Sequence, residues 1–95
     1  MKKNALISVY DKSSLGKICR VLRKFDIGII STGATAKKIL SLGYKCEEIS
    51  NLTKFKEILD GRVKTLNPKL HASFLYKRND SEHFKIIKKL NFPII

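Results

Sequence analysis

Short apolar runs that alternate with helical patterns constrain the fold of this chain more than any other feature. The run Ala5–Val9 is followed by Leu15, Ile18, Leu22 and Phe25, which recur at spacings of three and four residues. A short apolar run between polar residues is typical of a strand buried on both faces. The spacing that follows it predicts a helix over residues 13–25 with one apolar face, and Ser13 or Ser14 can cap its start.

The same alternation repeats further along the chain. A second buried strand is predicted over residues 27–31, followed by the polar turn Thr32–Thr35 and a helix over residues 36–42, with Gly43 as its C-terminal cap. Residues 44–49 form a weaker third strand in this prediction, because Lys45, Glu47 and Glu48 dilute its apolar character. A further helical segment is predicted to begin at Ser50 or Asn51, with Phe55, Ile58 and Leu59 on one side.

The last third of the chain combines one ambiguous and two clearer segments. Residues 59–71 are predicted to form a shaped loop rather than helix interior, because Gly61 permits a turn and Pro68 favours an extended Asn67. Residues 72–76 fit either the end of a short helix or a strand. A helix is predicted after Asp80 and Ser81 that stops at Asn91, and residues 92–95 resemble the start of another buried strand.

Alternating strands and helices with short connections are typical of βαβ units with a parallel sheet. In such sheets ligands bind at the carboxyl ends of the strands. The connections expected to carry function are therefore Tyr10–Ser13, Thr32–Thr35 and the central segment 59–71.

The bulk composition limits the function classes. The chain has 95 residues, 43% hydrophobic and 29% charged, which predicts one globular domain. Its net charge of +12 suggests nucleic-acid binding, but the basic residues are scattered and no aromatic residues are interleaved with them. We therefore expect no nucleic-acid partner.

The cysteines and the N-terminus point to an intracellular setting. Cys19 and Cys46 are isolated thiols without metal-ligand spacing, so neither a metal site nor a redox pair is predicted. The apolar run near the N-terminus is too short for a signal peptide or a membrane span. The sequence thus predicts a cytoplasmic protein with no membrane partner.

The central segment has the side chains of an anion site. Arg62 and Lys64 flank Val63, so in an extended backbone they point the same way, and Thr65 adds a hydroxyl donor. The alternative is an ordinary solvated basic loop. His71 could act as a general base, although a lone histidine is more often structural.

The two earlier connections could also bind an anion, because helix N-termini offer free N–H groups and a positive dipole end. Serine and threonine at helix starts are, however, ordinary caps. Convergence at one sheet edge favours a phosphate site, and its candidate residues are Lys12, Thr32, Thr35, Arg62, Lys64 and Thr65. No Walker A or GxGxxG motif is present, so a nucleoside triphosphate or dinucleotide site is not indicated.

Three motifs resemble a known family. In order and spacing, Ile7–Ser13, Ser31–Lys37 and Asp60–His71 resemble the N-terminal inosine-monophosphate (IMP) cyclohydrolase domain of the bifunctional purine biosynthesis protein. The resemblance covers essentially the whole chain. The Asp60–His71 motif is highly specific, whereas the Thr32–Thr35 loop is shared with the wider methylglyoxal-synthase-like fold.

The resemblance implies a methylglyoxal-synthase-like three-layer α/β/α fold with a parallel sheet. It also implies closure of the purine ring of 5-formamidoimidazole-4-carboxamide ribotide to IMP, with no cofactor. By the resemblance Lys64 is the expected catalytic residue, and the purine ribotide's phosphate end is held by Tyr10, Asp11, Lys12, Thr32, Gly33, Ala34, Thr35, Arg62, Val63, Lys64 and Thr65.

The resemblance further implies that residues 1–95 are a C-terminally truncated domain. The family's base-contacting groups, including an Asn, an Asp and a catalytic Lys, have no counterpart before Ile95. Full-length members carry an AICAR formyltransferase domain that uses 10-formyltetrahydrofolate, and they are expected to form homodimers. We therefore expect this chain to supply only the phosphate-binding side and to have little activity alone.

Three positions depart from the family pattern. Asn67 stands where the family usually has His, and Ala34 and Ser73 stand where Gly is usual. Because Ala34 lacks glycine's freedom at positive φ, an altered phosphate cradle is expected.

Two alternative functions remain open from the sequence. One is a non-catalytic regulatory domain of the same fold that binds a phosphorylated effector, which the motif from Arg62 to His71 disfavours. The other is a methylglyoxal synthase, which needs an acidic base; Asp11 and Asp60 are the nearest candidates and neither is convincing.

Overall fold

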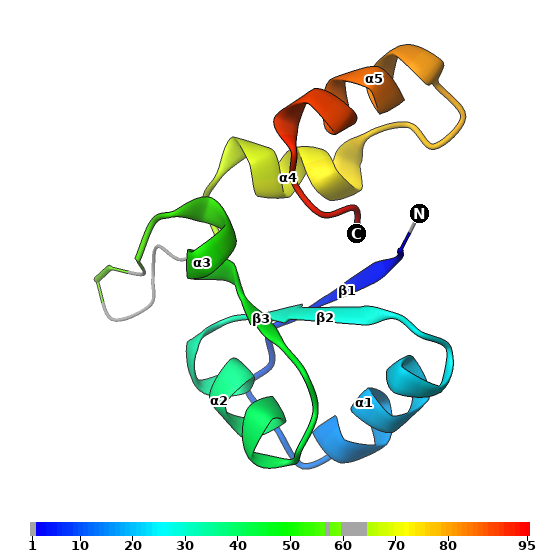
Figure 1. The fold of residues 1–95 in the computed structure, drawn as a ribbon. Helices are drawn as coiled ribbons and strands as arrows, with labels where there is room; N and C mark the ends of the chain where they lie inside the picture. Colours follow the sequence, from blue (N-terminus) through cyan, green and yellow to red (C-terminus); the bar gives the residue numbers. More distant parts are fainter. Residues whose placement is uncertain (1, 57, 60–64) are drawn as a thin grey trace.

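The computed structural model describes residues 2–56, 58–59 and 65–95 and contains a parallel sheet between two layers of helices (Figure 1). The strand order is β1-β2-β3, with both neighbouring pairs parallel. In chain order the elements are β1 (Asn4–Ile7), α1 (Leu15–Lys24), β2 (Gly28–Ser31), α2 (Gly33–Ser41), β3 (Glu47–Glu48), α3 (Ile49–Thr53), α4 (Pro68–Leu75) and α5 (Ser81–Leu90).

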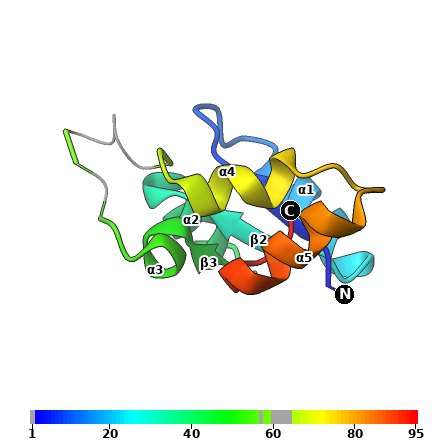
Figure 2. The ribbon, with the colours of Figure 1, turned by 90° about the horizontal axis from the view of Figure 1, so that it is seen from above.

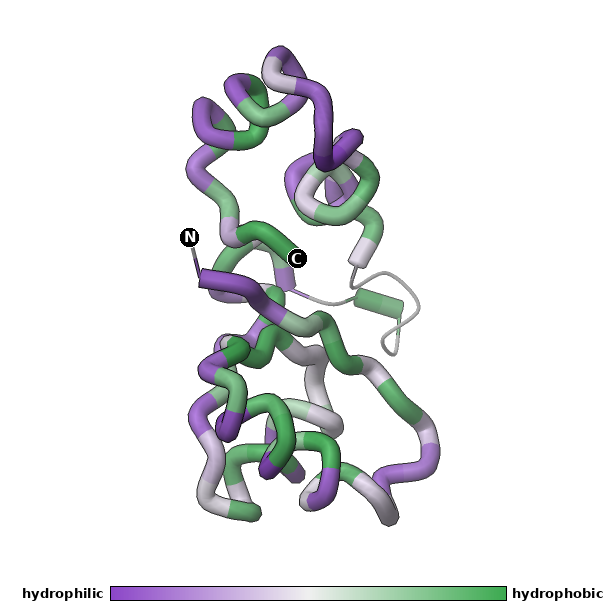
Figure 3. The backbone as a smooth tube through the Cα atoms, turned by 90° about the vertical axis from the view of Figure 1, so that its right-hand side faces the viewer, coloured by the Kyte–Doolittle hydropathy of each residue, from purple (hydrophilic) through white to green (hydrophobic). Residues whose placement is uncertain are grey.

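The pairing of β1 with β2 runs from Asn4 opposite Gly28 to Ile7 opposite Ser31. Helices α1 and α2 lie on one side of this sheet, and α4 and α5 lie on the other (Figures 1 and 2). Along the tube of Figure 3, hydrophobic and hydrophilic residues alternate within the helical turns, as expected for helices with one buried face. The predicted three-layer fold is confirmed.

Each face of the sheet has its own hydrophobic core, because successive side chains of a strand point to opposite faces. Ile29 packs toward α1 and α2, in a cluster that includes Leu15, Cys19 and Ile39. The next residue, Ile30, packs on the other face, in a cluster with Ile49, Leu70 and Phe92. The sequence prediction of strands buried on both faces is thus confirmed for β1 and β2.

Several element boundaries differ from the prediction. Helix α2 begins at Gly33 rather than at residue 36, because Thr32 is extended and serves as its N-cap. Strand β3 has only two residues, both exposed glutamates, instead of the predicted 44–49. Helix α3 ends at Thr53 because Lys54 adopts a left-handed conformation with φ of 60°, so Phe55, Ile58 and Leu59 do not share its face.

The segment after residue 65 is more helical than predicted. Residues 68–71 belong to α4, which extends through Leu75 and resolves the ambiguity over residues 72–76. Pro68 occupies the first position of this helix, where its missing N–H costs nothing. Helix α5 and its end at left-handed Asn91 match the prediction. Residues 92–95 are not a strand, although Phe92 is buried.

Candidate functional site

The carboxyl ends of the parallel strands lie at one edge of the sheet, from which the chain enters the loop after β1 and helix α2 (Figure 1). This carboxyl edge is where the sequence placed the ligand. The structure brings two of the three predicted connections together there.

The loop after β1 carries Tyr10, Asp11 and Lys12. The Tyr10 side chain is fully exposed, and the Asp11 carboxylate accepts a hydrogen bond of 2.9 Å from the Ser13 N–H. The hydrogen bonds from Ser13 hold the pKa of Asp11 below its ordinary value. Lys12 turns back onto its own loop: its Nζ donates to the carbonyl oxygens of Val9 at 2.8 Å and of Tyr10 at 3.3 Å. The ammonium of Lys12 is therefore held in one place.

Gly33, Ala34 and Thr35 form the first turn of α2. Their N–H groups have no preceding helical turn to supply acceptors, so they can donate to an anion. Gly33 has φ of 32°, a conformation that favours glycine. Ala34 is exposed and lies at an ordinary helical position with no positive φ, and an altered cradle relative to the family stays a prediction.

Threonine hydroxyls join these two connections. Thr35 Oγ1 accepts from the Val9 N–H at 3.3 Å and donates to the Val9 carbonyl at 3.1 Å. Thr32 Oγ1 shares a hydrogen bond of 2.8 Å with Ser8 Oγ, and makes no cap bond to α2. Ser8 was missed from the sequence; the only signal was a polar residue inside the apolar run Ala5–Val9.

The third connection is only partly described. Arg62, Val63 and Lys64 lie outside the described residues, so their predicted binding and catalytic roles stay predictions. Thr65 is half-buried, and its carbonyl accepts a hydrogen bond of 2.9 Å from the Asn67 N–H.

The two remaining departures from the family pattern both have structural partners. Asn67 is the N-cap of α4, and its side chain accepts from the Lys69 N–H at 2.9 Å. Ser73 is fully buried, and its hydroxyl donates to the Leu70 carbonyl. The candidate base His71 has Nδ1 3.0 Å from the Asn67 carbonyl oxygen and its ring 5.3 Å from that of Phe74, contacts that fit the structural interpretation.

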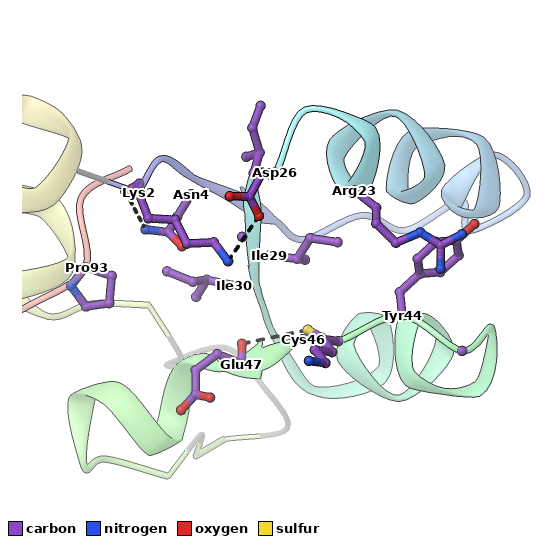
Figure 4. A pocket seen from close by; sticks show the side chains of 14 residues that line it. Lys2, Asn4, Arg23, Asp26, Ile29, Ile30, Tyr44, Cys46, Glu47 and Pro93 are labelled. Carbon is purple, nitrogen blue, oxygen red and sulfur yellow. Dashed lines mark hydrogen bonds and ion pairs between the residues drawn. The ribbon is translucent and has the colours of Figure 1, made fainter.

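A cavity of about 600 Å³ lies at the opposite, amino edge of the sheet (Figure 4). Lys2 and Asp26 form an ion pair of 3.7 Å at its rim, and Arg23 stacks 4.7 Å from the centre of the Tyr44 ring. Cys46 also lines it, and burial, followed by the nearby Cys19, Glu47 and Glu48, raises the pKa of this thiol to about 11. The charged groups are exposed and mixed in sign, so they do not single out one ligand.

Metal-binding clusters and membrane-spanning helices are both absent from residues 2–56, 58–59 and 65–95. No group of three His, Cys, Asp or Glu side chains there could hold a metal ion. Within the same residues, no helix has the length and apolar character needed to cross a membrane.

Comparison with known proteins places the chain in a family. The model of the MGS-like domain matches residues 14–95. The bifunctional purine biosynthesis protein PurH of Acetivibrio thermocellus is 48% identical over 95 residues, which are 100% of this chain and 18% of that protein. PurH of Ruminiclostridium cellulolyticum is 50% identical over 95 residues, which are again 100% of this chain and 18% of that protein.

The chain thus spans 18% of the length of these curated relatives. The crystal structure of ForH matches with a TM-score of 0.84 and 23% identity, covering 100% of this chain and 50% of that one, which supports the fold alone. The resemblance drawn from the three sequence motifs is confirmed: all 95 residues match part of the bifunctional purine biosynthesis protein, and the chain belongs to the MGS-like domain family.

Proposed function

We propose that this chain is an IMP cyclohydrolase domain that binds the phosphate end of 5-formamidoimidazole-4-carboxamide ribotide. The observation that carries the proposal is the identity of 48% and 50% to two bifunctional purine biosynthesis proteins over all 95 residues. Because the matches span all 95 residues, they extend over every position of the candidate site.

The geometry of the carboxyl edge supports the phosphate part of the proposal. The first turn of α2 offers the N–H groups of Gly33 and Ala34 and the positive end of the helix dipole. The loop after β1 brings the Lys12 ammonium, and this loop is bonded to α2 through Thr35. A phosphate group has only acceptor oxygens, and these groups are donors.

Ring closure needs the ribotide's carboxamide nitrogen to attack its formyl carbon, with loss of water. The enzyme's contribution to such a step is to hold the two groups close together and to stabilise the developing charge. Anchoring the phosphate fixes one end of the substrate. By the family resemblance Lys64 completes this anchor, while the groups that contact the base are not among these residues.

Ligand preference tests the proposal directly. The 95-residue chain is titrated with IMP, dihydroxyacetone phosphate and UMP by calorimetry, and we expect IMP to bind most tightly. Tighter binding of dihydroxyacetone phosphate would instead indicate a methylglyoxal synthase, and a preference for UMP would indicate a regulatory domain. Either result would overturn the proposal.

A matched pair of charge removals tests the role of Lys64. Lys64→Met is expected to weaken IMP binding by about tenfold or more, the effect of losing one charge-assisted hydrogen bond. Lys69→Met removes the same charge from an exposed position of α4 and should change the affinity less than about twofold. Equal losses in both variants would mean that only the net charge matters.

Turnover is the second readout. IMP formation from the formylated ribotide should be slow with this chain alone, because the resemblance implies that the base-side groups are missing. A rate like that of an intact cyclohydrolase would contradict this division of the site.

A further inference from the structure

Hydroxyl groups extend the connection between β1 and β2 beyond the end of their backbone pairing. The pairing ends at Ile7 and Ser31, where Ser31 Oγ donates to the Ile7 carbonyl at 2.7 Å. One residue further, Ser8 and Thr32 share a hydrogen bond of 2.8 Å. Beyond that pair, Thr35 Oγ1 contacts both the N–H and the carbonyl of Val9. The start of the loop after β1 is thus fixed to α2.

The single hydrogen of the Thr35 hydroxyl is used by Val9. A hydroxyl has one hydrogen, and that of Thr35 is donated to the Val9 carbonyl, 3.1 Å away. Its oxygen also accepts from the Val9 N–H, and the residue is only 3% exposed. Because a phosphate oxygen requires a donor, this hydroxyl has no hydrogen left for one.

The Val9 carbonyl connects Thr35 to Lys12. The same oxygen accepts from Thr35 Oγ1 at 3.1 Å and from Lys12 Nζ at 2.8 Å. Thr35 therefore orients one of the two carbonyls that hold the Lys12 ammonium; the other is the carbonyl of Tyr10, 3.3 Å from Nζ. Removing the hydroxyl leaves this carbonyl with one fewer donor and removes the hydrogen bonds between Val9 and α2, while the bond between Ser8 and Thr32 remains.

We propose that Thr35 is a positioning residue, which holds the Lys12 ammonium beside the first turn of α2 through the Val9 carbonyl. This inference rests on the proposed function, because it assumes that the Lys12 ammonium and the N–H groups of the first turn of α2 bind the same phosphate. Thr35 can still offer its backbone N–H to the ligand. Its side chain acts through Lys12.

A double-mutant cycle with inorganic phosphate as the probe tests this coupling. Thr35→Val keeps the shape but removes the hydroxyl, and we expect about tenfold weaker phosphate binding, the effect of one lost hydrogen bond. Thr35→Ser keeps the hydroxyl and should restore affinity to within about twofold. In a Lys12→Met background, Thr35→Val should change the affinity for phosphate less than about twofold, because the ammonium that Thr35 positions is no longer present.

Additive losses in that cycle would overturn the proposal, since a merely structural threonine weakens binding with or without Lys12. Failure of Thr35→Ser to restore binding would overturn it as well. Phosphate serves as the probe because its binding does not depend on recognition of a purine. Loss of the IMP preference with an intact cycle would refute the proposed function and leave the role of Thr35 standing.

A measurement on the ligand-free chain covers the case in which Thr35→Val does not fold. The side-chain ¹³Cε relaxation of Lys12 should show an ordered ammonium end in the unsubstituted protein, in contrast to Lys17, which is exposed on α1. A Lys12 end as mobile as that of Lys17 would overturn the proposal.

Discussion

At the carboxyl edge of the sheet three hydroxyl side chains are buried and hydrogen-bonded, whereas at the amino edge the charged side chains are exposed. Ser31, Thr32 and Thr35 are at most 3% exposed, and each hydroxyl has a partner across the β1–β2 connection. Lys2 and Asp26, at the other edge, have side chains 60% and 94% exposed. The amino edge nevertheless has the cavity of about 600 Å³.

The difference shows that the edge with the cavity is not the edge with the ordered polar side chains. Buried polar groups are costly unless they are bonded, so a saturated set of them fixes the local geometry. Exposed charges cost little and fix little. We infer that the carboxyl edge is the ordered one, and each of the following experiments tests that contrast.

The largest effect is expected from one buried hydroxyl at the carboxyl edge. Ser31→Ala removes the donor to the Ile7 carbonyl, and because the site is fully buried it should lower the free energy of unfolding by about 1–3 kcal/mol. Urea unfolding followed by circular dichroism measures this. The matched control is Ser41→Ala, since Ser41 also donates to a carbonyl, that of Lys38 at 2.6 Å, but is exposed. Equal losses in both would mean that burial does not strengthen the carboxyl edge.

A smaller effect is expected from the thiol at the amino edge. The pKa of Cys46 is raised to about 11 by burial first and then by Cys19, Glu47 and Glu48. At pH 8 a rise of the pKa from 9.0 to about 11 lowers the fraction of Cys46 present as thiolate about 100-fold. A more basic thiolate is also more nucleophilic, which raises the rate of exchange per thiolate by about tenfold. Native Cys46 should therefore exchange with an aromatic disulfide reagent about ten times more slowly than in urea.

The same raised pKa has a consequence for stability. Folding favours the neutral thiol, so its contribution is complete below pH 9 and is lost as the pH rises toward 11. The thiol-exchange experiment uses a Cys19→Ala background, in which Cys46 is the only thiol left in the sequence. Burial, the largest cause of the raised pKa, is kept there and the smaller contribution of Cys19 is removed, so the slowing should be at most about tenfold. Equal rates of disulfide exchange at Cys46 in the native and unfolded states would show that the thiol at the amino edge is in a water-like environment.

Much of the fold follows from the sequence because its signals are local. The strand runs, the spans of α1 and α5 and the stops at Gly43 and Asn91 depend on near neighbours in the chain. Of the apolar face predicted for α1, Leu15 is buried, whereas Ile18 and Phe25 are 44% and 65% exposed. Helix α4 also had a local signal, Asn67 followed by Pro68, which is an N-cap before a favourable first residue. The sequence predicts a loop there because proline is also frequent in loops, and the two signals are not distinguishable from the residue type alone.

The candidate site was predictable only in part. That the carboxyl edge carries Lys12 and the start of α2 follows from the order of strands and helices. The bonds of Thr35 and Ser8 do not, because their partners lie 26 and 24 residues away, and a threonine after a strand is equally consistent with a cap or a ligand. Which hydroxyls bind a ligand and which hold a loop depends on these tertiary contacts.

The smallest effect is expected at the ion pair between Lys2 and Asp26, which are 3.7 Å apart and largely exposed. Asp26 has φ of 54°, so replacing it would mix backbone strain with charge; Lys2→Met is the cleaner change. It should cost about 0–1 kcal/mol in urea unfolding at low salt, and nothing at 1 M NaCl, where charges are screened within about 3 Å. The control is Lys3→Met, because Lys3 is exposed and no carboxylate among the described residues lies within 4.0 Å of its ammonium. A larger loss that persists in high salt would mean that the amino edge is ordered by its charges, and the contrast between the two edges would then fail.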